Sequence, residues 1–297
     1  VQGAFSYQVP GIRAAVALNP NSDVSFYNYG IILMRLKRPK DAIAQFDRAL
    51  ALKPGVADTW NNRGVALNEL EQYDSALADF DKALALEPRY AAGLVNKGKS
   101  LFELKRFDEA LAAYDSALAI QQNLAEAWCG RGNVLLERDR DDEAIAAYRK
   151  SLHLKGDLDE AWSGLGRVLL KLHRFDDALE AHSQFTKVKP DVAEAWWRLG
   201  MTQLELRHLD QALAAFDKAV AIDAEYAEAR MSRGHALAEL RHYPEALASY
   251  DQALRLKPDM PFVRGSALGT RMQLCDWSDY ENEAWSLLER IENNEKA

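Results

Sequence analysis

Residues 57–90 read ADTWNNRGVALNELEQYDSALADFDKALALEPRY, and this stretch decides the fold of the chain. Its first part places apolar or small residues three or four positions apart, which is the spacing of one face of a helix. These residues are Trp60, Gly64, Leu67 and Leu70. A turn around Glu71–Tyr73 follows, and Asp74 then stands where the N-cap of a second helix is expected. The stretch therefore predicts a hairpin of two helices, the first over residues 57–70.

The same pattern recurs along the chain with a period of 34 residues and no insertion. Counting residue 57 as position 1 of its unit places glycine at position 8, alanine at position 20 and an aromatic ring at position 24. The position-8 glycines are Gly30, Gly64, Gly98, Gly132, Gly166, Gly200 and Gly234. Position 24 is aromatic in every unit but one, which has His182. The repeats therefore span residues 23–56, 57–90, 91–124, 125–158, 159–192, 193–226 and 227–260.

A single hairpin of this size cannot bury its apolar face, whereas stacked neighbours can. The repetition therefore predicts an all-α solenoid in which small residues at positions 8 and 20 let paired helices approach closely. The ring at position 24 is expected to fill the space between units. We divide the chain into residues 1–22, a truncated preceding repeat or N-terminal cap, residues 23–260, seven tandem units, and residues 261–297, C-terminal capping helices.

The second unit resembles the signature of the tetratricopeptide repeat (TPR) family at positions 4, 8, 11, 20, 24, 27 and 32. The matching residues are Trp60, Gly64, Leu67, Ala76, Phe80, Ala83 and Pro88. The seven units cover about four fifths of the 297 residues. The resemblance implies a right-handed α-solenoid, or superhelix, of tandem TPR helix-turn-helix hairpins. It also implies a concave groove that binds an extended peptide or a partner protein.

The composition narrows the classes of partner. The chain has 37 Lys and Arg against 45 Asp and Glu, a formal net charge of -8, which argues against nucleic acid or an anionic membrane as the main partner. No apolar run approaches the roughly 20 residues of a membrane span. The two cysteines, Cys129 and Cys275, lie far apart, so they predict neither a disulfide framework nor a zinc site. Reduced thiols are typical of a cytoplasmic protein.

The first helix of each unit buries positions 3, 4, 7, 8, 10, 11 and 14, which leaves positions 2, 5, 6, 9, 12 and 13 on the groove side. Position 6 carries asparagine in three successive units, and more amides lie nearby. Because an amide offers one acceptor and two donors, a row of amides can bind a peptide backbone whatever its side chains. The alternative is a polar residue tolerated on a solvated face. Our candidate groove residues are Asn28, Asn61, Asn62, Asn96, Lys99, Asn133, Arg167, Trp197 and Arg198.

Glutamate occupies position 2 in four consecutive units. These residues are Glu126, Glu160, Glu194 and Glu228. An acidic groove would favour a basic or neutral peptide with an apolar contact, but glutamate near a helix N-terminus is also favoured by the helix dipole whatever binds. Position 5 carries no lysine, so the carboxylate clamp of chaperone-binding TPR proteins is absent and docking of a chaperone tail is not expected.

Position 7 carries a cation in four units, at Arg63, Lys97, Arg131 and Arg233. A row of arginines can bind phosphate, but we expect their stems to cover apolar surface while their heads pair with acids of adjacent helices. The candidate partners are Asp81, Asp115 and Asp217.

No enzyme constellation emerges, because the chain has no glycine-rich phosphate loop, no nucleophile elbow and no HExxH helix. We therefore expect no enzyme, no cofactor and no metal. His182 and Phe185 exchange a large and a small residue one helical turn apart, which favours compensated packing over a ligand role. Gln203, where other units have leucine, is expected to loosen the sixth unit. Cys129 is expected to face the groove as a small filler rather than a nucleophile.

The ends of the array leave two functions open. Residues 274–280, LCDWSDY, are similar to the segment that joins the repeats to the catalytic part of O-linked N-acetylglucosamine transferases and their bacterial relatives. Ser278 and Glu281 then form a capping box before a further helix. The chain is thus either a protein-protein interaction module or the substrate-recognition arm of a larger O-GlcNAc-transferase-like glycosyltransferase whose catalytic domain is not in these residues. Self-association through the outer face is left open.

Overall fold

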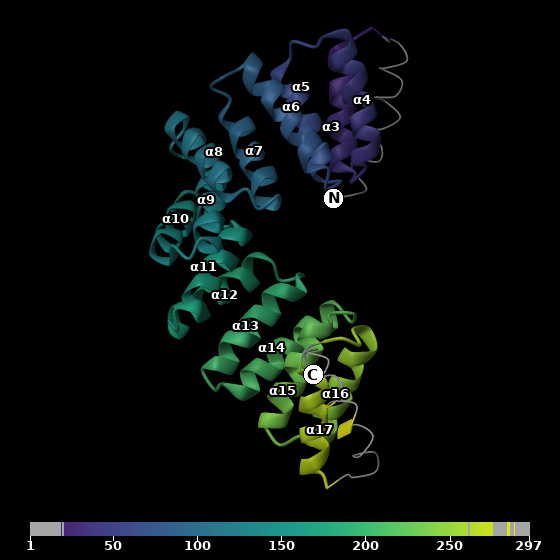
Figure 1. Cartoon of the computed structure of the whole chain (residues 1–297), viewed down its shortest axis with the longest axis vertical. Coiled ribbons are helices and arrows are strands. Elements are labelled where there is room, and N and C mark those ends of the chain that lie inside the picture. Colours follow the sequence, from purple (N-terminus) through teal and green to yellow (C-terminus); the bar gives the residue numbers. More distant parts are fainter. Residues whose placement is uncertain (1–18, 20, 261, 276–283, 286–287, 289–297) are drawn as a thin grey trace. The chain divides into compact units, whose positions relative to one another are not determined.

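The structure, a computed structural model, describes residues 19, 21–260, 262–275, 284–285 and 288. Within those residues it holds α-helices and no β-strand (Figure 1). The helices are α3 (Asp23–Arg35), α4 (Pro39–Leu52), α5 (Ala57–Asn68), α6 (Tyr73–Leu86), α7 (Ala91–Glu103), α8 (Phe107–Ile120), α9 (Ala125–Glu137), α10 (Asp141–Leu154), α11 (Asp159–Lys171), α12 (Phe175–Val188), α13 (Ala193–Glu205), α14 (Leu209–Ile222), α15 (Ala227–Glu239), α16 (Tyr243–Leu256) and α17 (Val263–Gln273). None of these helices has the length and apolar content needed to cross a membrane.

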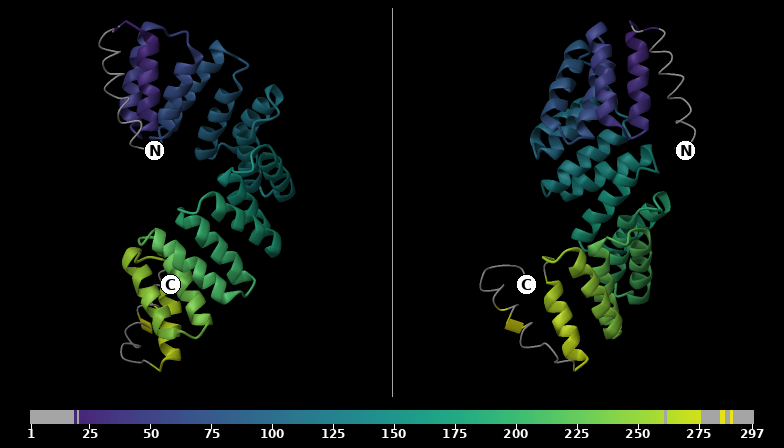
Figure 2. Two further views of the ribbon diagram at one scale, coloured as in Figure 1. Left: turned by 180° about the vertical axis from the view of Figure 1, so that it is seen from behind. Right: turned by 90° about the vertical axis from the view of Figure 1, so that its right-hand side faces the viewer.

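The chain divides into two compact units, Val1–Gly156 with α3 to α10 and Asp157–Ala297 with α11 to α17. In each unit the two helices of a repeat pack against each other, and the second helix packs against the first helix of the next repeat. The first helices of successive repeats also contact each other, for example α5 and α7. Figure 2 shows these hairpins side by side from two further directions. Each unit is therefore an all-α stack of helix-turn-helix hairpins with its core between neighbouring helices.

The turn inside each hairpin is the same in every repeat and includes a residue with a left-handed backbone at position 15. In the second unit Glu71 has φ 59°, Gln72 donates its N–H to Leu67 O at 3.0 Å, and Glu71 donates to Asn68 O at 3.0 Å. These two bonds satisfy the last carbonyls of α5 as a Schellman motif. The equivalent left-handed residues elsewhere are Lys37, Lys105, Asp139, His173, Arg207 and Arg241.

Position 8 of each repeat is glycine because the position-24 ring, from the second helix of the same hairpin, packs directly against it. A Cβ added at Gly98 would meet the Tyr114 ring at 2.8 Å, and one added at Gly64 would meet the Phe80 ring at 2.6 Å. Tyr114 also lies against the next repeat, where a Cβ at Gly130 would meet it at 2.3 Å. The ring at position 24 therefore fills space within its own hairpin as well as between repeats.

The expected N-cap role of Asp74 is wrong. Helix α6 begins at Tyr73, its N-cap residue is Gln72, and no side chain caps it. Asp74 instead lies in the first helical turn, where its charge is favourable to the helix dipole. The aspartates one and two repeats further on, Asp108 and Asp142, lie in the first turns of their helices in the same way.

The exchange at His182 and Phe185 is a packing exchange, as predicted. Both side chains are buried in α12, and the His182 ring occupies the place of the usual aromatic ring against Gly166. His182 Nδ1 lies 2.8 Å from the Thr202 hydroxyl. Among the residues that the structure describes, none forms a hydrogen bond with the buried Nε2 atom.

Helix α17 continues the repeat register beyond residue 260. Position 4 of a repeat donates to a carbonyl six residues earlier, as Trp60 does to Pro54 O at 2.8 Å, and Arg264 donates to Pro258 O at 3.3 Å in the same way. Cys275, at position 15, has the same left-handed backbone with φ 56°. Helix α17 is thus built as the first helix of an eighth repeat. Nearly all of the expected truncated repeat or cap over residues 1–22, the capping box at Ser278 and most of the junction-like stretch lie outside the described residues.

Candidate ligand-binding surface

The groove residues expected in the first compact unit lie at three depths. Asn28 and Lys99 are exposed, while Asn62, Asn96 and Asn133 are half-buried. Asn61 is buried, at 5% exposure, because it lies beneath the next repeat. These residues come from α3, α5, α7 and α9, the first helices of four successive repeats.

Two of the three position-6 amides, Asn62 and Asn96, are held by position-5 groups of the preceding repeat. Asn96 Nδ2 donates to Asn61 Oδ1 at 2.9 Å. Asn62 Nδ2 donates to the Tyr27 hydroxyl at 3.0 Å and to the backbone carbonyl of Asp58 at 2.9 Å. Each amide is therefore fixed in orientation, and among the described residues neither Oδ1 has a donor.

Asn133 is oriented differently, because its amide belongs to the packing of its own hairpin. Tyr148 donates its hydroxyl to Asn133 Oδ1 at 2.7 Å. The Tyr148 ring is fully buried against Gly132. This bond satisfies a buried phenol and leaves Asn133 a weaker candidate for reading a ligand.

The amide row ends after Asn96 for a steric reason. Position 6 of the next repeat is Gly130, and the 2.3 Å approach of the Tyr114 ring leaves no room for a side chain there. Cys129 at position 5 is buried, at 1% exposure, so the expectation that it faces the groove is wrong. Helical periodicity gives the angle of a side chain but not how closely the next hairpin covers it.

The position-7 cations pair with acids sixteen residues earlier, as predicted. Lys97 Nζ lies 2.7 Å from Asp81, Arg131 Nε 2.8 Å from Asp115, and Arg233 Nε 2.6 Å from Asp217. These pairs join the second helix of one repeat to the first helix of the next.

Arg63 makes the most buried of the ion pairs described. Its guanidinium makes a bidentate contact with the carboxylate of Asp79, in which Nε and Nη2 each donate a hydrogen bond of 2.7 Å. Asp79 is 2% exposed. The cation thereby neutralises a buried acid within its own hairpin.

In the second compact unit the three predicted groove residues lie on α11 and α13. Arg167 is exposed, whereas Trp197 and Arg198 are half-buried. Trp197 Nε1 donates to the Ser232 hydroxyl of the next repeat at 3.0 Å. Arg198 Nε donates to Glu194 at 2.8 Å, and its guanidinium carbon lies 5.6 Å from the centre of the Trp197 ring. The indole is thus held in place with its neighbouring cation already paired.

Two of the position-2 glutamates are also partly neutralised. Lys155 Nζ donates to Glu126 at 2.9 Å, and this hydrogen bond lowers the pKa of Glu126. Burial alone would raise the pKa of Glu228, but the bond from Lys257 and the local backbone bond outweigh it and lower that pKa. Three of the four position-2 glutamates, Glu126, Glu194 and Glu228, therefore have a cationic partner, which weakens the case for a basic ligand.

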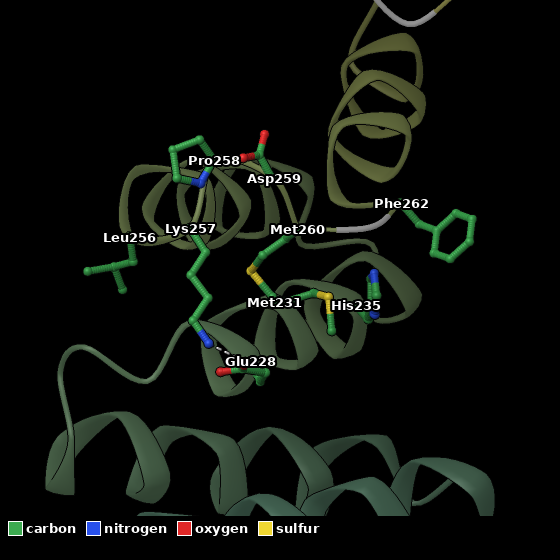
Figure 3. Close-up of a pocket in the computed structure, with 9 residues that line it drawn as sticks. All are labelled: Glu228, Met231, His235, Leu256, Lys257, Pro258, Asp259, Met260 and Phe262. Carbon is green, nitrogen blue, oxygen red and sulfur yellow. Dashed lines mark hydrogen bonds and ion pairs between the residues drawn. The ribbon is translucent and has the colours of Figure 1, made fainter. Parts of the chain in front are cut away.

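Two hollows at the C-terminal end of the second unit were not predicted. The apolar hollow, about 720 Å³, lies between α15 and the loop before α17 (Figure 3). Its lining is Glu228, Met231, His235, Leu256, Lys257, Pro258, Asp259, Met260 and Phe262. The polar hollow, about 770 Å³, lies nearer the hairpin turns and is lined among others by Arg207, His235, Glu239, Arg241 and Tyr243. The loop and turn residues of both hollows fall outside the first-helix positions that periodicity singles out.

A sequence signal for the apolar hollow does exist. Position 2 of the eighth repeat is Phe262, where four earlier units have glutamate, and its side chain is 65% exposed. Gly265 and Gly269 follow at groove positions 5 and 9, and a Cβ at either would meet no atom within 4 Å. Within the described residues no group of three or more His, Cys, Asp or Glu is placed to hold a metal ion.

Stacked helix-turn-helix hairpins of equal length define a helical-repeat protein. Family models described as tetratricopeptide or TPR repeats match residues 24–56, 57–90, 98–139, 125–158, 163–226 and 200–261. The chain belongs to the tetratricopeptide repeat family. No curated protein matches the sequence.

Solved structures that are similar to this chain include YrrB and an assembly of Cut9 and Hcn1. YrrB, described as a TPR protein with an unusual peptide-binding site, is 27% identical with a TM-score of 0.54, over 65% of this chain and 97% of that chain. The Cut9 and Hcn1 hetero-tetramer of the APC/C is 15% identical with a TM-score of 0.72, over 91% of this chain and 53% of the matched one. The second likeness supports the fold alone.

Proposed function

We propose that the chain is a protein-protein interaction module that binds an extended peptide segment of a partner. The peptide binds on the inner face of the first helices, which is the side that carries positions 2, 5, 6, 9, 12 and 13 of each repeat. The observation that carries this is the pair of amides at Asn62 and Asn96, each held by a group one repeat earlier. A donor or acceptor fixed before binding loses less conformational entropy when it meets a ligand. The similarity to YrrB, itself described as peptide-binding, adds support.

The amides suit a peptide backbone. Both N–H groups of Asn62 are engaged within the protein, so its Oδ1 is left to accept a backbone N–H. Asn96 uses one N–H on Asn61 and keeps its second N–H and its oxygen. The two residues lie at the same position of successive repeats, so they contact a ligand that runs from one repeat to the next.

The test is a display library of unstructured dodecapeptides selected on the full chain, followed by affinity measurements on variants. We expect one class of enriched peptides to bind the Asn62→Ala/Asn96→Ala variant roughly threefold or more weaker, since each hydrogen bond contributes about 0.5–1.5 kcal/mol. Asn123→Ala, on an exposed loop before α9, is the matched control and should bind as the wild type does. Failure of any peptide to enrich would contradict the proposal.

A further inference from the structure

The end of the second compact unit holds two adjoining hollows of opposite character that share His235. The ring of His235 lines both, packs against Tyr250 with ring centres 5.3 Å apart, and has Nε2 3.3 Å from the Ser266 hydroxyl. Burial lowers the pKa of His235, which favours the neutral form of the ring. His235 is thus a fixed, uncharged element between the two hollows.

The apolar hollow is built from flexible, polarisable side chains. Figure 3 shows Met231 of α15 and Met260 of the loop next to each other, with Phe262 projecting outward. Methionine adapts its shape to different apolar partners and is frequent at surfaces that bind varied peptides. The charge of Glu228 at the base is met by Lys257, so it does not oppose an apolar group.

The polar hollow carries an excess of positive charge. Arg207 donates to Glu239 at 2.8 Å, so that pair is neutral. Arg241 has no ion-pair partner in the part of the chain that the structure describes, and it lines the same hollow. The net positive charge of this hollow therefore favours an anionic group of a ligand at Arg241.

We propose that the two hollows form one bipartite site for a partner peptide that carries a large apolar side chain and, a few residues away, a carboxylate. The apolar side chain enters the hollow between Met231 and Met260, and the carboxylate pairs with Arg241. The inference rests on the proposed function and narrows it, because it names the peptide chemistry selected at the C-terminal end of the inner face.

The experiment uses the same dodecapeptide library on the full chain. We expect enrichment of peptides that combine Phe, Leu or Met with Asp or Glu. Such a peptide should bind Arg241→Gln about tenfold weaker and Met231→Ser about fivefold weaker, the scale of one charged hydrogen bond and one buried apolar side chain. Arg255→Gln and Met272→Ser, both exposed outside the two hollows, are matched controls and should bind normally.

Four outcomes would overturn the bipartite site. Enriched peptides that lose affinity on Asn62→Ala/Asn96→Ala but bind Arg241→Gln and Met231→Ser normally would remove it and keep the proposed function. Enriched peptides that are basic would contradict the charge argument. Displacement of the selected peptide by a synthetic peptide of residues 276–297 would assign the hollows to the chain's own C-terminal segment. If no peptide binds, both proposals fail together.

Discussion

His182 Nδ1 lies 2.8 Å from the Thr202 hydroxyl, and that hydroxyl also lies 3.1 Å from the carbonyl oxygen of Arg198. The Thr202 hydroxyl donates its proton to that carbonyl, so the Thr202 oxygen accepts a hydrogen bond from His182 Nδ1–H. The proton of the histidine ring therefore lies on Nδ1. The bare Nε2 is buried against Gly166 with no donor. The repeat therefore carries a neutral imidazole where its neighbours carry a benzene or phenol ring.

Acid should weaken the fold through this ring. Burial lowers the pKa of His182 from 6.5 to about 3, so between these values the unfolded chain binds a proton that the folded chain does not. Stability is complete above about pH 6.5 and is lost as the pH falls, by about 2 kcal/mol at pH 5. His182→Phe/Phe185→Ala, which restores the pair of the other repeats, should remove this loss in urea unfolding at pH 7.5 and 5.0.

The control for this pH effect is His153→Gln, which removes an exposed histidine. It should keep the pH dependence of the wild type. Equal pH dependence of the wild type and the double variant would show that His182 titrates normally in the folded chain.

Gln203 is a second local defect. The other six repeats have leucine at this position, and Gln203 Oε1 is buried with no hydrogen-bond partner in the described part of the chain. Gln203→Leu should raise the free energy of unfolding by about 1–2 kcal/mol, because it removes the desolvation penalty of an unpaired amide. Gln72→Leu, at an exposed site, should change it by less than about 0.5 kcal/mol. A destabilised Gln203→Leu would indicate a polar partner for this side chain.

Replacement of two glycines by alanine should change the stability of the fold in opposite directions. In Gly98→Ala the new methyl would meet the Tyr114 ring at 2.8 Å, so we expect a loss of about 1–3 kcal/mol. In Gly265→Ala, within α17, the methyl meets nothing within 4 Å, so better helix propensity should add about 0.5–1 kcal/mol. Thermal unfolding of both variants checks this, and a neutral Gly98→Ala would mean that the ring yields.

The position-7 cations should contribute unequally to stability. Removing Arg63 leaves the carboxylate of Asp79 buried and unpaired, which costs about 3 kcal/mol or more. Arg131 pairs with the exposed Asp115, so its loss should cost less than about 1 kcal/mol. Urea unfolding would give the free energy of unfolding of Arg63→Met and Arg131→Met. Similar losses in the two variants would contradict the claim that burial of the carboxylate makes the Arg63 pair more important.

Periodicity alone predicted the repeat, its helices and the position-7 ion pairs, because those depend on spacing within one chain segment. Burial of Asn61 and Cys129 was not predictable in this way, since it depends on how closely the next hairpin packs. The orientation of the position-6 amides also required the neighbouring repeat.

The apolar hollow escaped the sequence analysis for a related reason. Met260 belongs to a loop, and only folding brings it beside Met231 of α15. The exposed Phe262, where four earlier units have glutamate, was the residue that marked this end of the inner face.

The most direct test of binding by the inner-face amides is a thermodynamic cycle with backbone N-methylation. The affinity of a library-selected peptide and of its singly N-methylated versions would be measured by calorimetry on the wild type and on Asn62→Ala/Asn96→Ala. If these amides accept peptide N–H groups, one or two N-methyl positions weaken binding to the wild type roughly threefold or more and cause little further loss in the variant. Equal losses on both proteins at every position would contradict backbone recognition by Asn62 and Asn96.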